Sequence, residues 1–362
     1  MGIGTPVSTP WWSWGWPVLA WVVLGIIVAA GTSGIAITAA EIALIGTVFA
    51  AVYHAEVVAH RVGEPLGTLV LAVAVTIIEV ALIVSVMVAQ PAEKAGLARD
   101  TVFAAVMLVC NGIVGLCLLV GGARYREQGF QAQGALAALA VLAALTMLSL
   151  VIPNFTTTTV GPEFSTSQLI FAGVASLVLY GSFVFIQTIR HRDYFLPNGS
   201  AGEEAHAPPP SVAVALASAG LLLVSLVAIV ALAKTLTPTV EQGLSWLGAP
   251  KAVVGIVIAA LVLLPEGVAA VRAAHANRLQ TSLNLALGSS LATIGLTIPA
   301  VAAVSIAIDQ PLALGLDPKS EVLLALTLLV SVITLGTGRT TVLQGMVHLV
   351  ILAAFLFLAV VP

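Results

Sequence analysis

Long apolar runs follow one another along almost the whole chain and are separated by short polar connections. A helix needs about 20 consecutive apolar residues to cross the hydrocarbon core of a bilayer. By that length the pattern predicts eleven membrane-spanning helices. They are expected at residues 17–31, 34–59, 65–90, 100–121, 134–152, 168–189, 211–234, 249–274, 282–307, 321–336 and 342–361. The break after the first run rests on Gly31-Thr-Ser-Gly34 alone, so a count of ten stays open.

A polar, proline-rich connection near residues 190–210 divides the chain into two halves. Five apolar runs precede it after the first one, and five follow it. The expected organisation is an N-terminal segment with the extra first helix (1–33), a first five-helix repeat (34–189), the polar connection (190–210) and a second five-helix repeat (211–362). The fold class is therefore an all-α membrane protein.

The composition agrees with this reading and excludes several classes of function. Hydrophobic residues make up 60% of the chain and charged residues 8%, whereas a soluble domain has roughly 25% charged residues. The partner implied by these values is a lipid bilayer. A net charge of -3 leaves no basic stripe for nucleic acid. The two cysteines, Cys110 and Cys117, lie in one apolar run and predict neither a disulfide framework nor a metal site.

Two glutamates, Glu79 and Glu266, interrupt runs that are otherwise typical of membrane spans. The only Lys or Arg within eleven residues of either acid is Arg272, which follows Glu266 by six positions. A carboxylate in hydrocarbon is costly unless it is protonated or holds a cation. Each of these two positions is therefore a candidate site for cations and protons.

The approach to each acid is similar in the two halves. Pro65 opens the span that reaches Glu79 fourteen residues later, and Pro250 opens the span that reaches Glu266 sixteen residues later. Internal repeats with functional groups near the bilayer midplane recur in transporters. The similarity predicts that the two acids occupy equivalent places.

The spans that follow the acids align at a constant offset of 180 positions, which pairs Thr101 with Thr281 and Gly115 with Gly295. An odd number of helices in each repeat forces the second repeat to insert upside down relative to the first. The halves are therefore expected to be inverted repeats whose acid-bearing helices meet at the bilayer centre.

Neutral oxygens near the acids extend the candidate site. Pro265 has no amide hydrogen, so the carbonyl of Leu261 should lose its helical partner and could face an ion. The supporting ligands predicted from side chains are Thr76, Asn111, Asn284, Ser289, Ser290 and Thr293. Two carboxylates with neutral oxygens are the ligands that hard cations such as Ca2+ prefer. Each hydroxyl or amide also has a structural alternative, which is to bond a helix carbonyl or join two helices.

Several segments resemble the bacterial cation/proton antiporters of ChaA type, which belong to the Ca2+:cation antiporter superfamily. The similarity covers nearly the whole chain, from about Val52 to His348. The segments are Gly63-Glu-Pro-Leu-Gly-Thr-Leu-Val-Leu-Ala-Val-Ala-Val-Thr-Ile-Ile-Glu79-Val, Leu264-Pro-Glu266-Gly, Asn284-Leu-Ala-Leu-Gly-Ser-Ser-Leu-Ala-Thr-Ile-Gly-Leu-Thr-Ile-Pro299 and Thr337-Gly-Arg-Thr-Thr-Val-Leu-Gln-Gly345.

The resemblance implies that one acidic residue in each of two inverted repeats forms the ion site, and the matching positions here are Glu79 and Glu266. It also implies an antiporter, not an enzyme, which exchanges Ca2+ or Na+, with K+ as a further candidate, for protons across the bacterial inner membrane. No cofactor is implied. The transported ions would be Ca2+, Na+ and H+, and the oligomeric state stays open.

Elementary electrostatics gives the same behaviour without the resemblance. Two carboxylates about 4 Å apart repel each other by about 4 kcal/mol at an effective dielectric constant near 20. At least one of them should then be protonated when no metal is bound. A divalent cation would displace protons and protons would displace the cation. Such competition, combined with alternating access, produces antiport.

The distribution of cations predicts an orientation. Allocating the basic residues to alternate membrane sides places eight on the N-terminal side and five on the other. The eight are Arg61, Arg124, Arg126, Arg190, Arg192, Arg272, Arg278 and Arg339, and the five are Lys94, Arg99, Lys234, Lys251 and Lys319. Cytoplasmic connections carry the excess of Lys and Arg, so the N-terminus is predicted to be cytoplasmic.

The sequence also permits two other functions, a passive channel and an intramembrane protease. A passive cation channel could use the same two glutamates. The segment Gly31-Thr-Ser33-Gly34 matches the Gly-x-Ser-Gly pattern of rhomboid-like intramembrane serine proteases, with His348 as a conceivable base. Such short patterns recur by chance in glycine-rich chains. Glu41, about seven residues into its span, could line an ion or proton pathway, and an interfacial role is its alternative.

Overall fold

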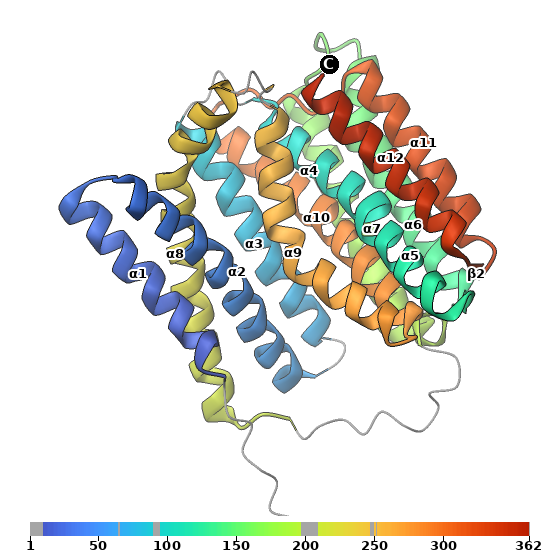
Figure 1. The fold of residues 1–362 in the computed structure, drawn as a ribbon. Helices are drawn as coiled ribbons and strands as arrows, with labels where there is room; N and C mark the ends of the chain where they lie inside the picture. The colour runs from blue at the N-terminus through green and yellow to red at the C-terminus, as the bar shows by residue number, and fades with distance from the viewer. Residues whose placement is uncertain are drawn as a thin grey trace, which may run out of the picture. The chain divides into compact units, whose positions relative to one another are not determined.

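A computed structural model describes residues 10–63, 66–89, 95–196, 209–246, 250 and 252–361 (Figure 1). Within these residues it is almost entirely helical, and ten helices are long and apolar enough to cross a membrane. The helix α3 (Leu66–Ala89) adds a further apolar helix. Every one of the eleven predicted runs contains a helix, and the predicted all-α membrane fold is confirmed.

The first half contains α1 (Trp11–Ala30), α2 (Gly34–Val62), α3, α4 (Leu97–Met107), α5 (Val114–Tyr125), α6 (Ala132–Thr146) and α7 (Thr166–Phe185). The second half contains α8 (Val212–Trp246), α9 (Ala252–His275), α10 (Leu279–Ala307), α11 (Pro318–Leu335) and α12 (Val342–Val360). A π-helical segment, η1 (Leu108–Ile113), joins α4 to α5 within one span.

Shorter elements complete the chain. They are the π segments η2 (Met147–Val151) and η4 (Ile186–Arg190), the 3-10 turns η3 (Ile152–Phe155) and η5 (Arg192–Phe195), and the strands β1 (Gln128–Gly129) and β2 (Arg339–Thr340). The two strands pair antiparallel, with Gln128 opposite Thr340. The turn η5 belongs to the predicted polar connection, whose residues 197–208 lie outside the described part of the chain.

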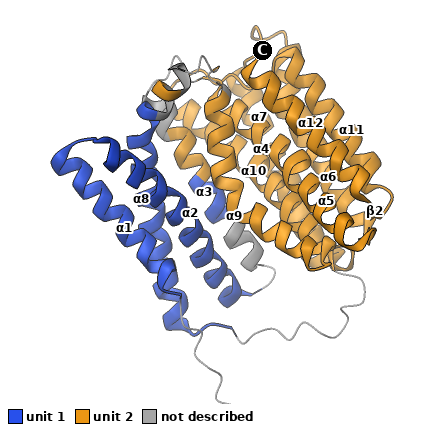
Figure 2. Ribbon diagram, viewed as in Figure 1, with its two compact units in different colours: residues 1–78, 204–240 blue, residues 79–203, 241–362 orange. Residues whose placement is uncertain are grey.

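The helices form two compact units, shown in Figure 2. One unit comprises Met1–Ile78 and Glu204–Val240, and the other comprises Glu79–Glu203 and Glu241–Pro362. Each half contributes its first helix, α2 or α8, to the first unit and its last three spans to the second. The boundary falls within α3, directly before Glu79. The units therefore cut across the two halves of the sequence.

Packing in the first unit fixes α1 against α2. The ring of Trp16 lies over Gly46, where a side chain would collide with it. Pro17 has no amide hydrogen, so the carbonyl of Ser13 is free to accept other donors. The Nε2 atom of the buried His54 lies 3.0 Å from this carbonyl oxygen. The extra first helix is thus held to α2 by a close ring contact and a buried polar contact.

The second unit is built around α10, which packs against α4, α6, α7 and α9. The fifth span of each half crosses the third span of the other, because α7 packs on α10 and α12 packs on α5. A Cβ atom at Gly115 would lie 3.1 Å from the Cβ of His348 on α12. A Cβ at Gly295 would lie 2.7 Å from the Cβ of Tyr180 on α7. The predicted equivalence of Gly115 and Gly295 therefore corresponds to two equivalent helix crossings.

A second pair of contacts follows the same symmetry. A Cβ at Gly173 of α7 would lie 3.5 Å from the Cα of Pro299, and a Cβ at Gly345 of α12 would lie 3.0 Å from the Cα of Leu119. Leu119 and Pro299 are also 180 positions apart. Each crossing thus places a glycine of a fifth span against an equivalent position of the opposite third span.

Connections that alternation predicts on one membrane side come together at one end of the second unit. Arg124 Nη1 lies 2.8 Å from His275 Nε2, and Gln128 Nε2 donates to Asn277 Oδ1 at 2.9 Å. The strand pair β1–β2 lies between the same connections. These contacts join the loops that follow α5, α9 and α11.

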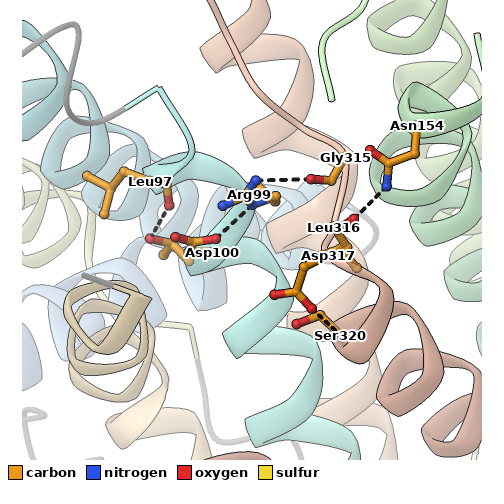
Figure 3. Close-up of polar contacts among 9 residues, drawn as sticks. Leu97, Arg99, Asp100, Asn154, Gly315, Leu316, Asp317 and Ser320 are labelled. Carbon is orange, nitrogen blue, oxygen red and sulfur yellow. Dashed lines mark hydrogen bonds and ion pairs between the residues drawn. The ribbon is translucent and has the colours of Figure 1, made fainter. Parts of the chain in front are cut away.

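Loops at the other end of the second unit meet around Arg99 and Asn154, and Figure 3 shows these contacts. Arg99 donates to Asp100 Oδ1 at 2.8 Å and to the carbonyl of Gly315 at 3.0 Å. Asn154 donates to the carbonyl of Leu316. The start of α4, the end of the fourth span and the segment before α11 are therefore joined. Both ends agree with the predicted alternation of the spans.

Large apolar side chains on the outward helices of the second unit are exposed. Phe171 of α7 is 68% exposed, Ile333 of α11 is 63% exposed and Val350 of α12 is 68% exposed. Exposed apolar surface on this scale marks contact with a membrane or a partner. Together with the length of the helices, it indicates contact with lipid.

The glycine crossings predict a specific stability difference. We expect Gly295→Ala to lower the free energy of unfolding by about 1–3 kcal/mol, since the new methyl group overpacks the crossing with Tyr180. Gly288→Ala on the same helix is the matched control, because nothing lies within 4 Å of its Cβ position. Thermal unfolding of both variants in detergent tests this expectation. Equal melting temperatures would contradict it.

Candidate functional site

Glu79 lies in α3 at the edge of the second unit and is 2% exposed. The hydroxyls of Thr293 and Thr297 on α10 approach its carboxyl group as hydrogen-bond donors. Neither contact reaches the geometry of a formed hydrogen bond, and both carboxyl oxygens have no partner among the described residues. A fully buried carboxyl group of this kind must be neutralised by a proton or a cation.

Glu266 lies in α9, directly after Pro265, and is partly buried. Because proline has no amide hydrogen, the carbonyl of Leu261 lacks its usual donor within this helix. A Cβ at Gly267 would lie 3.3 Å from Cδ1 of Ile113, so α9 touches the end of η1 beside the acid. The helix α9 also packs against α10. Glu79 therefore lies near α10, the third span of the second half, and Glu266 lies on a helix that contacts η1, in the third span of the first half.

Hydroxyl groups line the face of α10 that carries Thr293. Ser282, Ser289, Ser290 and Thr297 each have a buried hydroxyl oxygen without a hydrogen-bond partner among the described residues. A hydroxyl in a helix commonly donates to the carbonyl four residues earlier. Several hydroxyls of other helices do so here, namely those of Thr47, Thr101, Thr146, Ser149, Thr188, Ser225, Thr235 and Thr237. The contrast leaves the α10 hydroxyls available to ligate an ion or water.

Thr297 was not among the ligands predicted from the sequence. It lies four residues after Thr293 and therefore on the same face of α10. That spacing is the signal that could have found it. The buried hydroxyl of Thr297 now extends the candidate site by one helical turn.

Both predicted amide ligands are occupied by protein groups. Asn111 donates to Thr327 Oγ1 at 2.9 Å, and its Oδ1 lies 3.1 Å from His348 Nδ1. Asn284 donates to the carbonyl of Phe195 at 2.6 Å and accepts from Gln280 at 3.0 Å. In this structure the two amides join helices, which was the structural alternative for them.

The π segment η1 was not predicted from the sequence. It contains Asn111 and lies in the middle of the third span of the first half. Single π turns inside α-helices are frequently located at functional sites. Its place beside Gly267, and so next to Glu266, makes it part of the candidate site.

Two further predicted residues belong to the first unit. Thr76 lies in α3, three residues before Glu79, and is 7% exposed. Glu41 is exposed near the start of α2. A ligand role for Thr76 and a pathway role for Glu41 stay predictions.

A cation at this site would be ligated mainly by neutral oxygens. Among the described residues, no group of three or more His, Cys, Asp or Glu side chains is arranged to hold a metal. The candidate ligands are the carboxyl groups predicted from the sequence, the α10 hydroxyls and the Leu261 carbonyl. Oxygen ligands of this kind suit Ca2+ and other hard cations.

Ser33 has a structural role. It is the N-cap of α2, and its hydroxyl accepts a hydrogen bond from the amide of Ala36 at 3.2 Å. His348, the conceivable base, contacts Asn111 and Thr334 within the second unit. These contacts satisfy a helix end and a buried network respectively, so they give no support to a serine protease.

Comparison with known proteins identifies the family of the chain. The family of sodium/calcium exchanger proteins matches residues 32–189 and 217–361. A putative ionic transporter, y4hA, of Sinorhizobium fredii is 50% identical over 359 residues, covering 98% of this chain and 97% of the relative. The sodium-potassium/proton antiporter ChaA of Escherichia coli is 36% identical over 346 residues, covering 94% of this chain and 93% of the relative.

The fold is also similar to that of a solved exchanger structure. The crystal structure of an H+/Ca2+ exchanger, CAX, superimposes with a TM-score of 0.72 at 13% identity and covers 95% of this chain and 87% of that chain. The matching family consists of transporters, so the protease alternative is excluded. The chain belongs to the sodium/calcium exchanger family, within the Ca2+:cation antiporter superfamily.

Proposed function

We propose that this protein exchanges Ca2+ or Na+, and K+ as a further candidate, for protons by alternating access. Glu79 and Glu266 are the shared cation and proton acceptors in this proposal. The observation that supports it most directly is the buried carboxyl group of Glu79, which has no hydrogen-bond partner among the described residues and lies beside hydroxyls of α10.

The chemistry of antiport follows from that environment. Removing a carboxylate from water costs several kcal/mol unless another charge compensates it. A proton neutralises the group covalently, and a cation neutralises it as an ion pair. Since the two compensate the same charge, each lowers the affinity for the other. A site that is reached alternately from the two membrane sides then exchanges one load for the other.

The candidate ligands are suited to several cations. Ca2+ takes six to eight oxygens at roughly 2.3–2.6 Å, and hydroxyls can supply several of them. We assign the supporting ligands to Ser289, Ser290, Thr293, Thr297 and the Leu261 carbonyl, and we keep Thr76 as a further candidate. Asn111 and Asn284 are assigned to holding helices together, because protein groups already occupy their amides.

The protein is a multi-pass membrane protein, and we place it in the bacterial inner membrane with a cytoplasmic N-terminus. The excess of arginine on the N-terminal side supports this orientation, since positive connections stay in the cytoplasm. Arg126 and Arg339 belong to the connections that the strand pair β1–β2 joins, and Arg124 lies in the last turn of α5 just before them.

Flux in proteoliposomes tests the shared site. We expect an imposed pH step to drive uptake of Ca2+ or Na+ by the wild-type protein. Uptake should fall below about 1% in Glu79→Gln and in Glu266→Gln, because an amide can neither carry the proton nor balance the cation. Glu127→Gln is the matched control, since this glutamate is 50% exposed in a surface ion pair with Arg339.

The same experiment separates antiport from a passive channel. A channel with these two acids would pass cations down their own gradient without a pH step and would not move protons in return. Uptake that ignores the pH step, or that survives both glutamine substitutions, would overturn the proposal.

The newly found hydroxyl provides a further prediction. Thr297→Val should weaken the apparent cation affinity by about threefold to tenfold, because the substitution removes one oxygen beside Glu79 and keeps the shape of the side chain. Thr146→Val is the control, since its hydroxyl donates to the carbonyl of Leu142 at 2.8 Å. The concentration dependence of cation uptake at fixed pH measures both. Equal affinities in the two variants would remove Thr297 from the site.

A further inference from the structure

A buried polar network lies beside the π segment η1 and connects it to α11 and α12. His348 is 0% exposed, and its two ring nitrogens lie 3.1 Å from Asn111 Oδ1 and 3.2 Å from Thr334 Oγ1. Asn111 in turn donates to Thr327 Oγ1 at 2.9 Å. All four side chains are at most 4% exposed. A histidine at this depth in a span is a functional-site hypothesis by default.

The contacts define which ring nitrogen carries the proton. With Asn111 Nδ2 donating to Thr327, its Oδ1 is an acceptor, so His348 Nδ1 must donate to it. In a neutral ring Nε2 is then an acceptor, and the hydroxyl of Thr334 can supply its proton. Every donor of this network therefore has an acceptor while His348 is uncharged.

The π segment creates a defect in the backbone that the histidine covers. The amide of Val114 donates to the carbonyl of Val109, five residues earlier. In an α-helix that amide would bond the carbonyl of Cys110, so this carbonyl does not accept from its usual donor. The imidazole of His348 lies within hydrogen-bonding reach of this carbonyl. The single N–H of the neutral ring is used by Asn111 Oδ1, so the histidine holds the π turn through the Asn111 side chain and lies beside the Cys110 carbonyl.

Among the described residues, the equivalent crossing of α7 on α10 differs from this one. Position 291, which aligns with Asn111 at the offset of 180, is a leucine. Gly173 and Gly345 occupy equivalent crossings. The residue three positions after Gly345 is His348, whereas the residue three positions after Gly173 is Ser176. The helix α10 is α-helical from Leu279 to Ala307. Of these two crossings, the one that has the histidine and the asparagine is the one that contains a π turn.

The π turn lies next to an acid of the proposed site. Its last residue, Ile113, touches the backbone of α9 at Gly267, which follows Glu266. A Cβ at Gly115, just after the turn, would lie 3.1 Å from the Cβ of His348. A change in the conformation of the turn would therefore move the surface on which the helix of Glu266 rests.

We propose that His348 is a positioning residue that holds the π turn and thereby the backbone around Glu266 in its cation-binding geometry. This role rests on the proposed function, because it assumes that Glu266 accepts the transported ions. The histidine remains neutral and carries no transported proton. Its substitution should change how tightly the cation binds without changing the number of protons exchanged.

Two substitutions separate the contacts of the ring. His348→Leu removes both polar contacts, whereas His348→Asn keeps a donor at the place of Nδ1 for Asn111. We expect His348→Leu to raise the half-saturating cation concentration about tenfold with little change in maximal rate, and His348→Asn to restore most of the affinity. Thr334→Val is a third variant and should have a small effect, because it removes only the contact at Nε2.

The measurement is cation uptake into proteoliposomes as a function of cation concentration, repeated across pH. An unchanged half-saturating concentration in His348→Leu would overturn the proposal, and so would a His348→Asn variant that behaves like the leucine variant. A shifted pH dependence in His348→Asn would identify the ring as a proton carrier and would also overturn it. If His348→Leu does not fold, His348→Asn still tests the proposal, since a strongly weakened affinity or a shifted pH dependence in that variant would overturn the positioning role.

Glu266→Gln in the same vesicles keeps this test separate from the proposed function. Wild-type uptake in Glu266→Gln would overturn the shared site whatever the histidine variants do. Loss of uptake in Glu266→Gln together with normal affinity in His348→Leu would overturn the positioning role alone.

Discussion

The cost of a charged carboxyl group away from water governs this structure. Glu79 is 2% exposed, and no basic side chain accompanies it among the groups that contact its carboxyl. In such a place the acid is stable only with a proton or a cation, and the proposed exchange rests on competition between the two. The free hydroxyls of α10 follow from the same requirement, because they can ligate a cation yet leave the protonated acid undisturbed.

Much of the fold could be predicted from the sequence because single spans are local features. Each apolar run contains its own helix, and Glu79 and Glu266 were visible because they interrupt such runs. The π turn could not be predicted in this way. Its contact with His348 is invisible locally, because the histidine is 237 positions from Asn111 in the sequence. Thr297 was missed for a different reason, since its significance depends on which face of α10 meets the acid.

The compact units differ from the sequence halves for a physical reason as well. Close crossings at Gly115 and Gly295 join the third span of each half to the fifth span of the other. Small residues let helix backbones approach closely. In lipid, where the hydrophobic effect does not drive helices together, such close packing stabilises their association. The halves are therefore interleaved within the second unit, while α2 and α8 belong to the other unit.

The two halves are equivalent in their crossings but not in what surrounds their acids. Glu79 faces hydroxyls of a regular α-helix, whereas the helix of Glu266 rests on a π turn that a buried histidine supports. Two identical acids would bind protons with equal intrinsic strength and be distinguished only by their mutual repulsion. Different surroundings remove that equality, so one acid can be neutralised before the other. An exchanger that trades one cation for protons benefits from such an order, because a half-neutralised site still attracts its next load.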